Sequence, residues 1–187
     1  ITVTSGPGPL GSARGHEGPT TLVHVGPTTT WGPAARVATM DWPRNERSPL
    51  AGVKMVSYAE NALALATARA RGADEALLPN TAGNLCEGSG SNVFVVLDGV
   101  LHTPPLSAGC LPGVTRDLVC EVVDVVVADL PFAVVHECEE LFLTSTTRGV
   151  HPVSHVDDRA LPTCPGPVTR AATDALAALT ARLLAEA

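Results

Sequence analysis

The sequence has no uninterrupted apolar run of about 18 residues, so no segment could form a membrane-spanning helix. It also lacks a basic stretch followed by an apolar core at its start, and it carries no lipidation signal. We therefore expect a cytoplasmic protein with no membrane partner. Basic residues are in deficit, with 12 Lys and Arg against 19 Asp and Glu, and the net charge of −7 argues against a nucleic-acid partner.

Metal-binding and disulfide patterns are equally scarce. The five cysteines show no CxxC spacing, which excludes a typical zinc cluster or disulfide framework and favours reduced thiols. The six histidines show no metal-ligand spacing, so we predict no metal site. What the chain does have is 187 residues with 45% apolar and 17% charged content, enough for a sizeable core and too apolar for wholesale disorder.

Strand and helix patterns alternate along the chain without a strict βαβ rhythm, which predicts a mixed α/β or α+β fold. Hydrophobic periodicity and capping residues predict helices over 57–71, 115–128 and 167–187. Short β-rich runs bounded by Gly, Pro and Asn predict strands over 1–4, 21–25, 36–40, 50–56, 75–78, 84–86, 92–97, 100–102, 131–135, 141–144 and 150–156.

Lys54 interrupts the apolar run Leu50–Val56. An ammonium group is costly to bury unless it is paired or used. Burial would also make the amine more nucleophilic, which favours a catalytic role. The alternative is an edge-strand lysine that reaches solvent and discourages aggregation; the local sequence leaves both open.

Glu87 ends a predicted strand and precedes a loop whose glycines permit close approach of a ligand. A carboxylate held there could keep a heteroaromatic nitrogen protonated, and the alternative is a solvated acid at an ordinary turn. Leu111–Gly113 leads directly into a predicted helix, whose free amides could bind a phosphate. The hydroxyl run Thr144–Thr147 could donate to the same anion, although each pattern also occurs as a plain helix start or strand.

In this order and combination, the sequence resembles the fold-type IV (class IV) pyridoxal-phosphate enzymes. These include branched-chain and D-amino-acid aminotransferases and 4-amino-4-deoxychorismate lyase. The resemblance extends from about residue 50 to residue 169. The motifs that carry it are Leu50–Lys54 with Ser57–Asn61, Ala70–Leu77, Glu87–Phe94, Thr103–Leu106 with Leu111–Arg116, and Phe142–Thr146 followed by Pro152 and Val153.

The resemblance implies pyridoxal 5′-phosphate as cofactor and a role for each matching residue. Lys54 would form the Schiff base with the cofactor and then transfer protons, and Glu87 would pair with the pyridine nitrogen. Tyr58 would approach the phenolic oxygen of the cofactor.

Four residues would hold the 5′-phosphate on the same grounds. Val114 and Thr115 would offer backbone amides, Thr115 also its hydroxyl, and Ser145 and Thr146 would lie near the same group.

The Leu50–Lys54 lead-in and the Lys54-to-Tyr58 spacing favour a 4-amino-4-deoxychorismate lyase-like enzyme, which would release pyruvate and form 4-aminobenzoate for folate synthesis. A branched-chain or D-amino-acid aminotransferase is the alternative, because the residues that contact substrate in this family lie largely in its N-terminal domain. A further alternative is a catalytically incompetent or non-enzymatic module of the same fold. Either enzyme would act on a small amino substrate.

We predict that residues 1–45 are a remnant of the family's small N-terminal domain plus a linker, and that residues 46–187 form the larger C-terminal domain that binds the cofactor. Family members carry a phosphate-anchoring arginine in the N-terminal domain, and its usual motif is absent here. We therefore expect part of a longer protein or a degenerate member. The resemblance also implies a homodimer.

Overall fold

The computed structural model describes residues 1–186. The helices are α1 (Ala59–Ala70), α2 (Val114–Val122) and α3 (Pro167–Ala185), with 3-10 turns η1 (Leu106–Ala108) and η2 (Phe132–His136). The strands are β1 (Thr2–Thr4), β2 (Thr20–Leu22), β3 (Ala35–Thr39), β4 (Glu75–Pro79), β5 (Leu85–Gly88), β6 (Asn92–Leu97), β7 (Val100–Thr103), β8 (Val126–Val127), β9 (Glu140–Ser145), β10 (Gly149–Val156) and β11 (Arg159–Ala160).

One mixed sheet of nine strands dominates the body, in the order β5-β4-β3-β10-β9-β6-β7-β8, with β11 paired to β10. β3 runs parallel to both β4 and β10, and β7 runs parallel to β8. The other neighbouring pairs within the sheet are antiparallel. This architecture confirms the predicted mixed fold.

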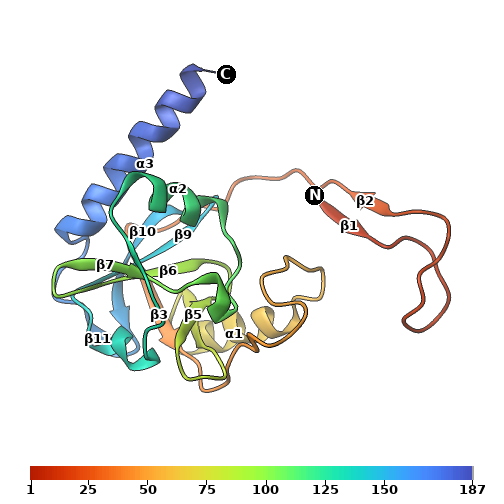
Figure 1. Ribbon diagram of the computed structural model, residues 1–187, viewed down its shortest axis with the longest axis horizontal. Coiled ribbons are helices and arrows are strands. Elements are labelled where there is room, and N and C mark those ends of the chain that lie inside the picture. Colours follow the sequence, from red (N-terminus) through yellow and green to blue (C-terminus); the bar gives the residue numbers. More distant parts are fainter. Residues whose placement is uncertain (187) are drawn as a thin grey trace.

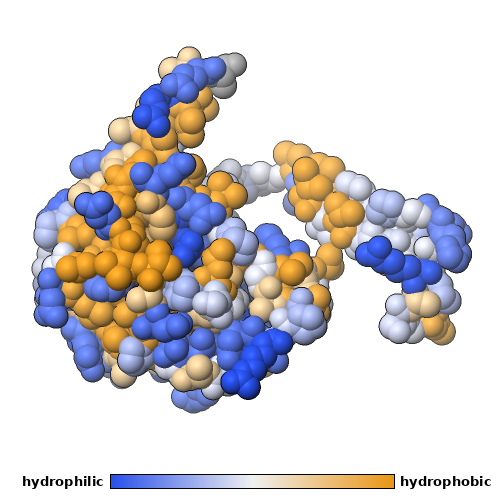
Figure 2. Space-filling model, viewed as in Figure 1, coloured by the Kyte–Doolittle hydropathy of each residue, from blue (hydrophilic) through white to orange (hydrophobic). Residues whose placement is uncertain are grey.

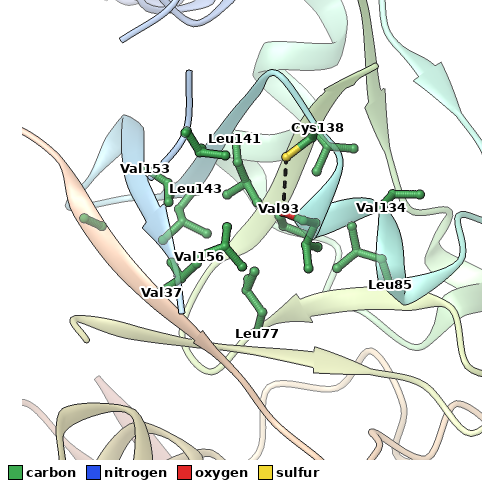
Figure 3. Close-up of a cluster of buried hydrophobic side chains, with 14 of the residues drawn as sticks. Val37, Leu77, Leu85, Val93, Val134, Cys138, Leu141, Leu143, Val153 and Val156 are labelled. Atoms are coloured by element: carbon green, nitrogen blue, oxygen red, sulfur yellow. Dashed lines mark hydrogen bonds between the residues drawn. The ribbon is translucent and has the colours of Figure 1, made fainter. Parts of the chain in front are cut away.

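Successive side chains of a strand point to opposite faces of the sheet. The central strands β6 and β9 carry runs of consecutive apolar residues, so both faces of the sheet are buried. In β6, Val93 and Val95 enter one core cluster, whereas Phe94 enters a second one. The first cluster gathers side chains from β3, β4, β5, β6, β9 and β10, which places it on the inner face of a curled sheet (Figure 3). In the second cluster the rings of Phe94 and Phe142 stack with centroids 4.7 Å apart.

The helices cover the outer faces of the sheet (Figure 1). α1 packs small residues, Ala64 and Ala68, against β3 and β4. α2 and α3 pack on each other and on β9, and α3 continues beyond the body. α1 ends where Gly72 adopts a left-handed conformation with φ of +75°, as the sequence predicts. No helix among residues 1–186 has both the length and the apolar character needed to cross a membrane.

The N-terminal hairpin β1–β2 lies apart from the body, and Figure 2 shows apolar surface on this arm. Val3 and Leu22 in the hairpin and Val23 after it are exposed. A linker joins it to β3, which is inserted in the large sheet between β4 and β10. Part of residues 1–45 therefore shares a sheet with the strands of the larger predicted domain. The domain boundary itself stays a prediction.

Three predicted elements are wrong. Residues 50–56 form turns rather than a strand, because Gly52 has φ of +74° and the chain folds back through bonds from Ala51 to Ser48. The second helix ends at Val122 and its remaining valines are extended, with β8 paired to β7, as suits β-branched residues. The predicted strand at 131–135 is the 3-10 turn η2.

Candidate active site

A cavity of about 380 Å³ opens where the Leu50–Tyr58 loop, the β5–β6 loop, the start of α2 and the β9–β10 turn meet. All seven residues predicted from the sequence line it: Lys54, Tyr58, Glu87, Val114, Thr115, Ser145 and Thr146. The β9–β10 turn and the start of β6 meet here because β10, β9 and β6 are neighbours in the sheet, and the Leu50–Tyr58 loop and the start of α2 complete the wall from outside the strands. The roles of these residues stay predictions.

Lys54 is the only lysine in the sequence, and it lies on the loop before α1. Its Nζ donates to Tyr58 Oη at 3.3 Å, and Tyr58 is the N-cap residue that directly precedes α1. Of the two interpretations that the local sequence leaves open, the structure shows a lysine that reaches solvent, since Lys54 is exposed. Its placement at a cavity wall, rather than desolvation, is what makes the amine available to a ligand. Ser57 and Glu60 have the spacing of a capping box in the sequence, but the N-cap residue of α1 is Tyr58, and no side chain within residues 1–186 caps the helix.

Glu87 sits in β5 and is only 8% exposed. Its Oε2 accepts the backbone N–H of Leu111 at 2.8 Å. Its Oε1 lies 3.2 Å from Arg44 Nε. This is an ion pair without a hydrogen bond, because Arg44 Nε–H has no hydrogen-bond acceptor within residues 1–186. Burial raises the pKa of Glu87, against the lowering effects of the Leu111 N–H, Arg44 and Lys54. Oε1 is paired with Arg44 by charge but accepts no hydrogen bond within residues 1–186, so it can still accept one from a ligand.

Arg44 is a cavity residue that the sequence analysis missed. Its Nη1 donates to Glu60 Oε2 at 2.8 Å and to Asn61 Oδ1 at 3.1 Å, so it ties the start of α1 to the carboxylate of Glu87. Arg44 stands in a polar connector between elements. No local pattern there distinguishes it from a solvated arginine.

The start of α2 presents donors toward the cavity. Gly113 precedes the helix in an extended conformation with no side-chain cap, so the first-turn amides of Val114 and Thr115 are available to an anion. Gly113 is required because a Cβ there would overlap Asn92 Oδ1, and the Asn92 amide holds Leu111 O at 2.8 Å.

Two further hydroxyls favour a ligand in this cavity. Ser91 and Thr144 line it, their Oγ and Oγ1 atoms are buried, and neither has a hydrogen-bond partner within residues 1–186. Buried hydroxyls are normally satisfied, so both atoms are candidates to bind a ligand. Ser91 and Thr144 stand in the Glu87–Phe94 and Phe142–Thr146 motifs of the sequence. Only the structure distinguishes their hydroxyls from those of the adjacent serines and threonines.

The donor set fits pyridoxal phosphate. Helix-start amides and hydroxyls suit its phosphate, the free oxygen of Glu87 suits a protonated ring nitrogen, and Lys54 supplies a primary amine. Between Ile1 and Glu186, no three His, Cys, Asp or Glu side chains are grouped so as to hold a metal ion.

Comparisons with known proteins agree with this geometry. Residues 1–156 match the model of the family described as amino-transferase class IV. A branched-chain-amino-acid aminotransferase of Pseudomonas aeruginosa is 36% identical over 114 residues, which cover 56% of this chain and 36% of that enzyme. The Escherichia coli K12 enzyme of the same name is 33% identical over 106 residues, covering 54% of this chain and 34% of that enzyme.

A solved structure of the branched-chain amino acid aminotransferase from Thermobaculum terrenum, in its PLP form, superposes with a TM-score of 0.74 and 30% identity. The match covers 78% of this chain and 50% of that one. The chain thus spans about half of that structure and about a third of the two curated relatives. These relatives are named aminotransferases, which supports the alternative of the sequence analysis rather than the lyase. Since the family model matches well over half of its length, this chain belongs to the class IV aminotransferase family.

Proposed function

We propose that this chain forms the cofactor-binding part of a pyridoxal-phosphate-dependent transaminase of branched-chain amino acids. The observation that carries the proposal is the cavity that brings the only lysine together with Glu87 and the unpartnered donors at Ser91 and Thr144. When bound, pyridoxal phosphate conjugates with amines and withdraws electrons from the substrate α-carbon.

The chain's own residues would bind and orient the cofactor and move protons. Lys54 Nζ would be the amine that attaches the cofactor and, once released, would take the proton from the substrate α-carbon and deliver it to the reactive carbon of the cofactor. Tyr58 Oη accepts a hydrogen bond from that amine at 3.3 Å. Glu87 keeps the ring nitrogen protonated.

The other end of the cavity binds the phosphate. Val114 and Thr115 donate through the amides at the start of α2, and Ser145 and Thr146 add hydroxyls from the end of β9. These contacts would hold the phosphate and so fix the position of the cofactor relative to Lys54.

The names of the matched relatives support branched-chain amino acids as substrates. Pyruvate elimination from 4-amino-4-deoxychorismate, favoured by the residues leading into Lys54, is the second candidate. The homodimer and the cytoplasmic location stay predictions. Size-exclusion chromatography with light scattering tests the homodimer.

The test starts with borohydride reduction of the protein with added pyridoxal phosphate, followed by peptide mapping. We expect a reduced adduct on Lys54, and because no other lysine is present, the matched Lys54→Arg variant leaves only the N-terminal amine as a reactive amine. An adduct that persists in Lys54→Arg, or none in the wild type, contradicts the proposed attachment.

Substrate assays on the protein follow. Formation of 2-oxo acids from leucine, isoleucine and valine is the expected result. Pyruvate and 4-aminobenzoate from 4-amino-4-deoxychorismate, with no transamination, would favour the second candidate and overturn the first.

A further inference from the structure

A buried ion pair lies beside the cavity without lining it. Arg148 Nη2 is 3.1 Å from Glu75 Oε2, and both side chains are 3% exposed. Neither residue is among those that line the candidate active site. Burying two charges costs desolvation free energy that only good geometry and further hydrogen bonds offset. The contacts around the pair show which segments of the chain it holds together.

Arg148 makes three separate contacts. Besides Glu75, its Nη1 lies 2.9 Å from His151 Nδ1, and its guanidinium lies 3.6 Å from the centroid of the Trp31 ring. Trp31 belongs to the linker before β3, and its Nε1 donates to Thr147 Oγ1 at 3.3 Å. The linker thus covers the pair and is bonded to the turn that carries it.

Glu75 connects the pair to a second part of the site. Its Oε1 accepts the hydroxyl of Ser89, in the β5–β6 loop. The carbonyl of Ser89 in turn accepts the side-chain amide of Asn61 at 2.6 Å. Arg148 directly follows Ser145–Thr147 in the β9–β10 turn, so one ion pair ties together two connections that both contribute to the cavity wall.

We infer that Arg148 and Glu75 are positioning residues that clamp the Gly88–Ser91 loop to the Ser145–Thr147 turn, with Trp31 as cover, and so set the affinity of the site for phosphate. This rests on the proposed function. The clamp acts at the phosphate end of the cavity because Ser145 and Thr146 are the hydroxyl donors that it fixes. A misplacement of about 1 Å at such donors is enough to weaken a site strongly.

The test compares pyridoxal phosphate with pyridoxal, which lacks the phosphate. In Arg148→Met we expect the Kd for pyridoxal phosphate to rise at least about tenfold, while the Kd for pyridoxal stays nearly unchanged. Trp31→Phe keeps the stacked ring and should retain most of the affinity, whereas Trp31→Ala should lose it. Equal weakening of both ligands would show a merely structural role and overturn the inference.

The matched control is Arg71→Met. Arg71 Nη2 pairs with Asp157 Oδ1 at 2.7 Å, and neither of these residues lines the cavity. This variant also loses an arginine ion pair, so its affinity for pyridoxal phosphate should match the wild type. A comparable loss in the control would overturn the specific role of Arg148. If Arg148→Met does not fold, Trp31→Ala gives the same comparison from the linker.

Hydrogen exchange of the ligand-free protein separates this inference from the proposed function. Amides of residues 88–91 and 145–148 should exchange faster in Arg148→Met than in Arg71→Met. If the wild type binds no pyridoxal phosphate, the proposed function fails, and faster exchange still supports the clamp. Unchanged exchange in both segments overturns the clamp whatever the ligand does.

Discussion

Replacing Glu87 by glutamine tests the proposed partner of the ring nitrogen. The substitution removes the charge but keeps an oxygen that can accept the Leu111 N–H, now bonded at 2.8 Å. Arg44 keeps its ion pair with Glu60 at 2.8 Å, so no buried cation is left unpaired. The change therefore isolates the charge of Glu87.

In the ligand-free protein, glutamine should be the more stable residue at neutral pH. Burial raises the pKa of Glu87 above its ordinary value of 4.5, so the folded state binds a proton more tightly than the unfolded state. The charged carboxylate thus lowers the free energy of unfolding above the folded-state pKa. That cost disappears as the pH falls through the raised pKa toward 4.5. The stability difference between variant and wild type should shrink over the same window.

Cofactor binding should change in the opposite direction. A hydrogen bond to a charged partner contributes about 1.5–3 kcal/mol. Since 1.4 kcal/mol is a factor of ten, we expect roughly ten- to hundredfold weaker binding of pyridoxal phosphate at neutral pH. The wild-type affinity should itself fall as acid protonates Glu87, and the variant should lack that dependence.

Urea denaturation without cofactor and absorbance titration with cofactor measure the two effects. Glu60→Gln is the matched control, because Glu60 lines the same cavity with its side chain 47% exposed. Wild-type affinity in Glu87→Gln would refute the pairing with the ring nitrogen. A lower free energy of unfolding in the variant at neutral pH would refute the burial argument.

Three other substitutions test the site and the core. Lys54→Ala should change the free energy of unfolding by less than about 0.5 kcal/mol, because Lys54 is exposed, yet abolish the reduced adduct in mass spectrometry. Phe94→Ala should cost about 3–5 kcal/mol in urea denaturation, since its fully buried ring stacks on Phe142; an unchanged midpoint would contradict the packing. Gly113→Ala should cost about 1–3 kcal/mol through overlap with Asn92, and a titration should show weaker pyridoxal-phosphate binding; unchanged values would show that the α2 start is not tightly packed.

Much of the fold follows from local sequence patterns. The β-rich run of residues 92–97 predicts β6, and Asp98–Gly99 is a pair typical of the turn that follows, in which both residues have positive φ. The prediction fails where an apolar run is short and its conformation depends on distant contacts. Residues 50–56 show this limit, since they read as a strand but form a solvent-facing loop at the cavity.

The same limit applies to the residues of the candidate site. Lys54, Glu87 and the Gly113–Thr115 helix start could be selected from the sequence because they stand in an ordered set of motifs that resembles a known family, although each local pattern alone leaves its role open. Arg44 could not, because its role comes from Glu60 and Glu87, which only the folded chain brings to it.

By itself the sequence determined the mixed fold, most of the strands and the family, because periodicity, turn chemistry and ordered motifs act over a few residues. Only the tertiary structure decided that Lys54 is exposed and that the hydroxyls of Ser91 and Thr144 have no hydrogen-bond partner among the 186 described residues. It also joined Arg148 to Glu75, 73 residues earlier in the chain. The burial and the pairing of side chains depend on which strands become neighbours in the sheet. No local sequence pattern specifies that strand order.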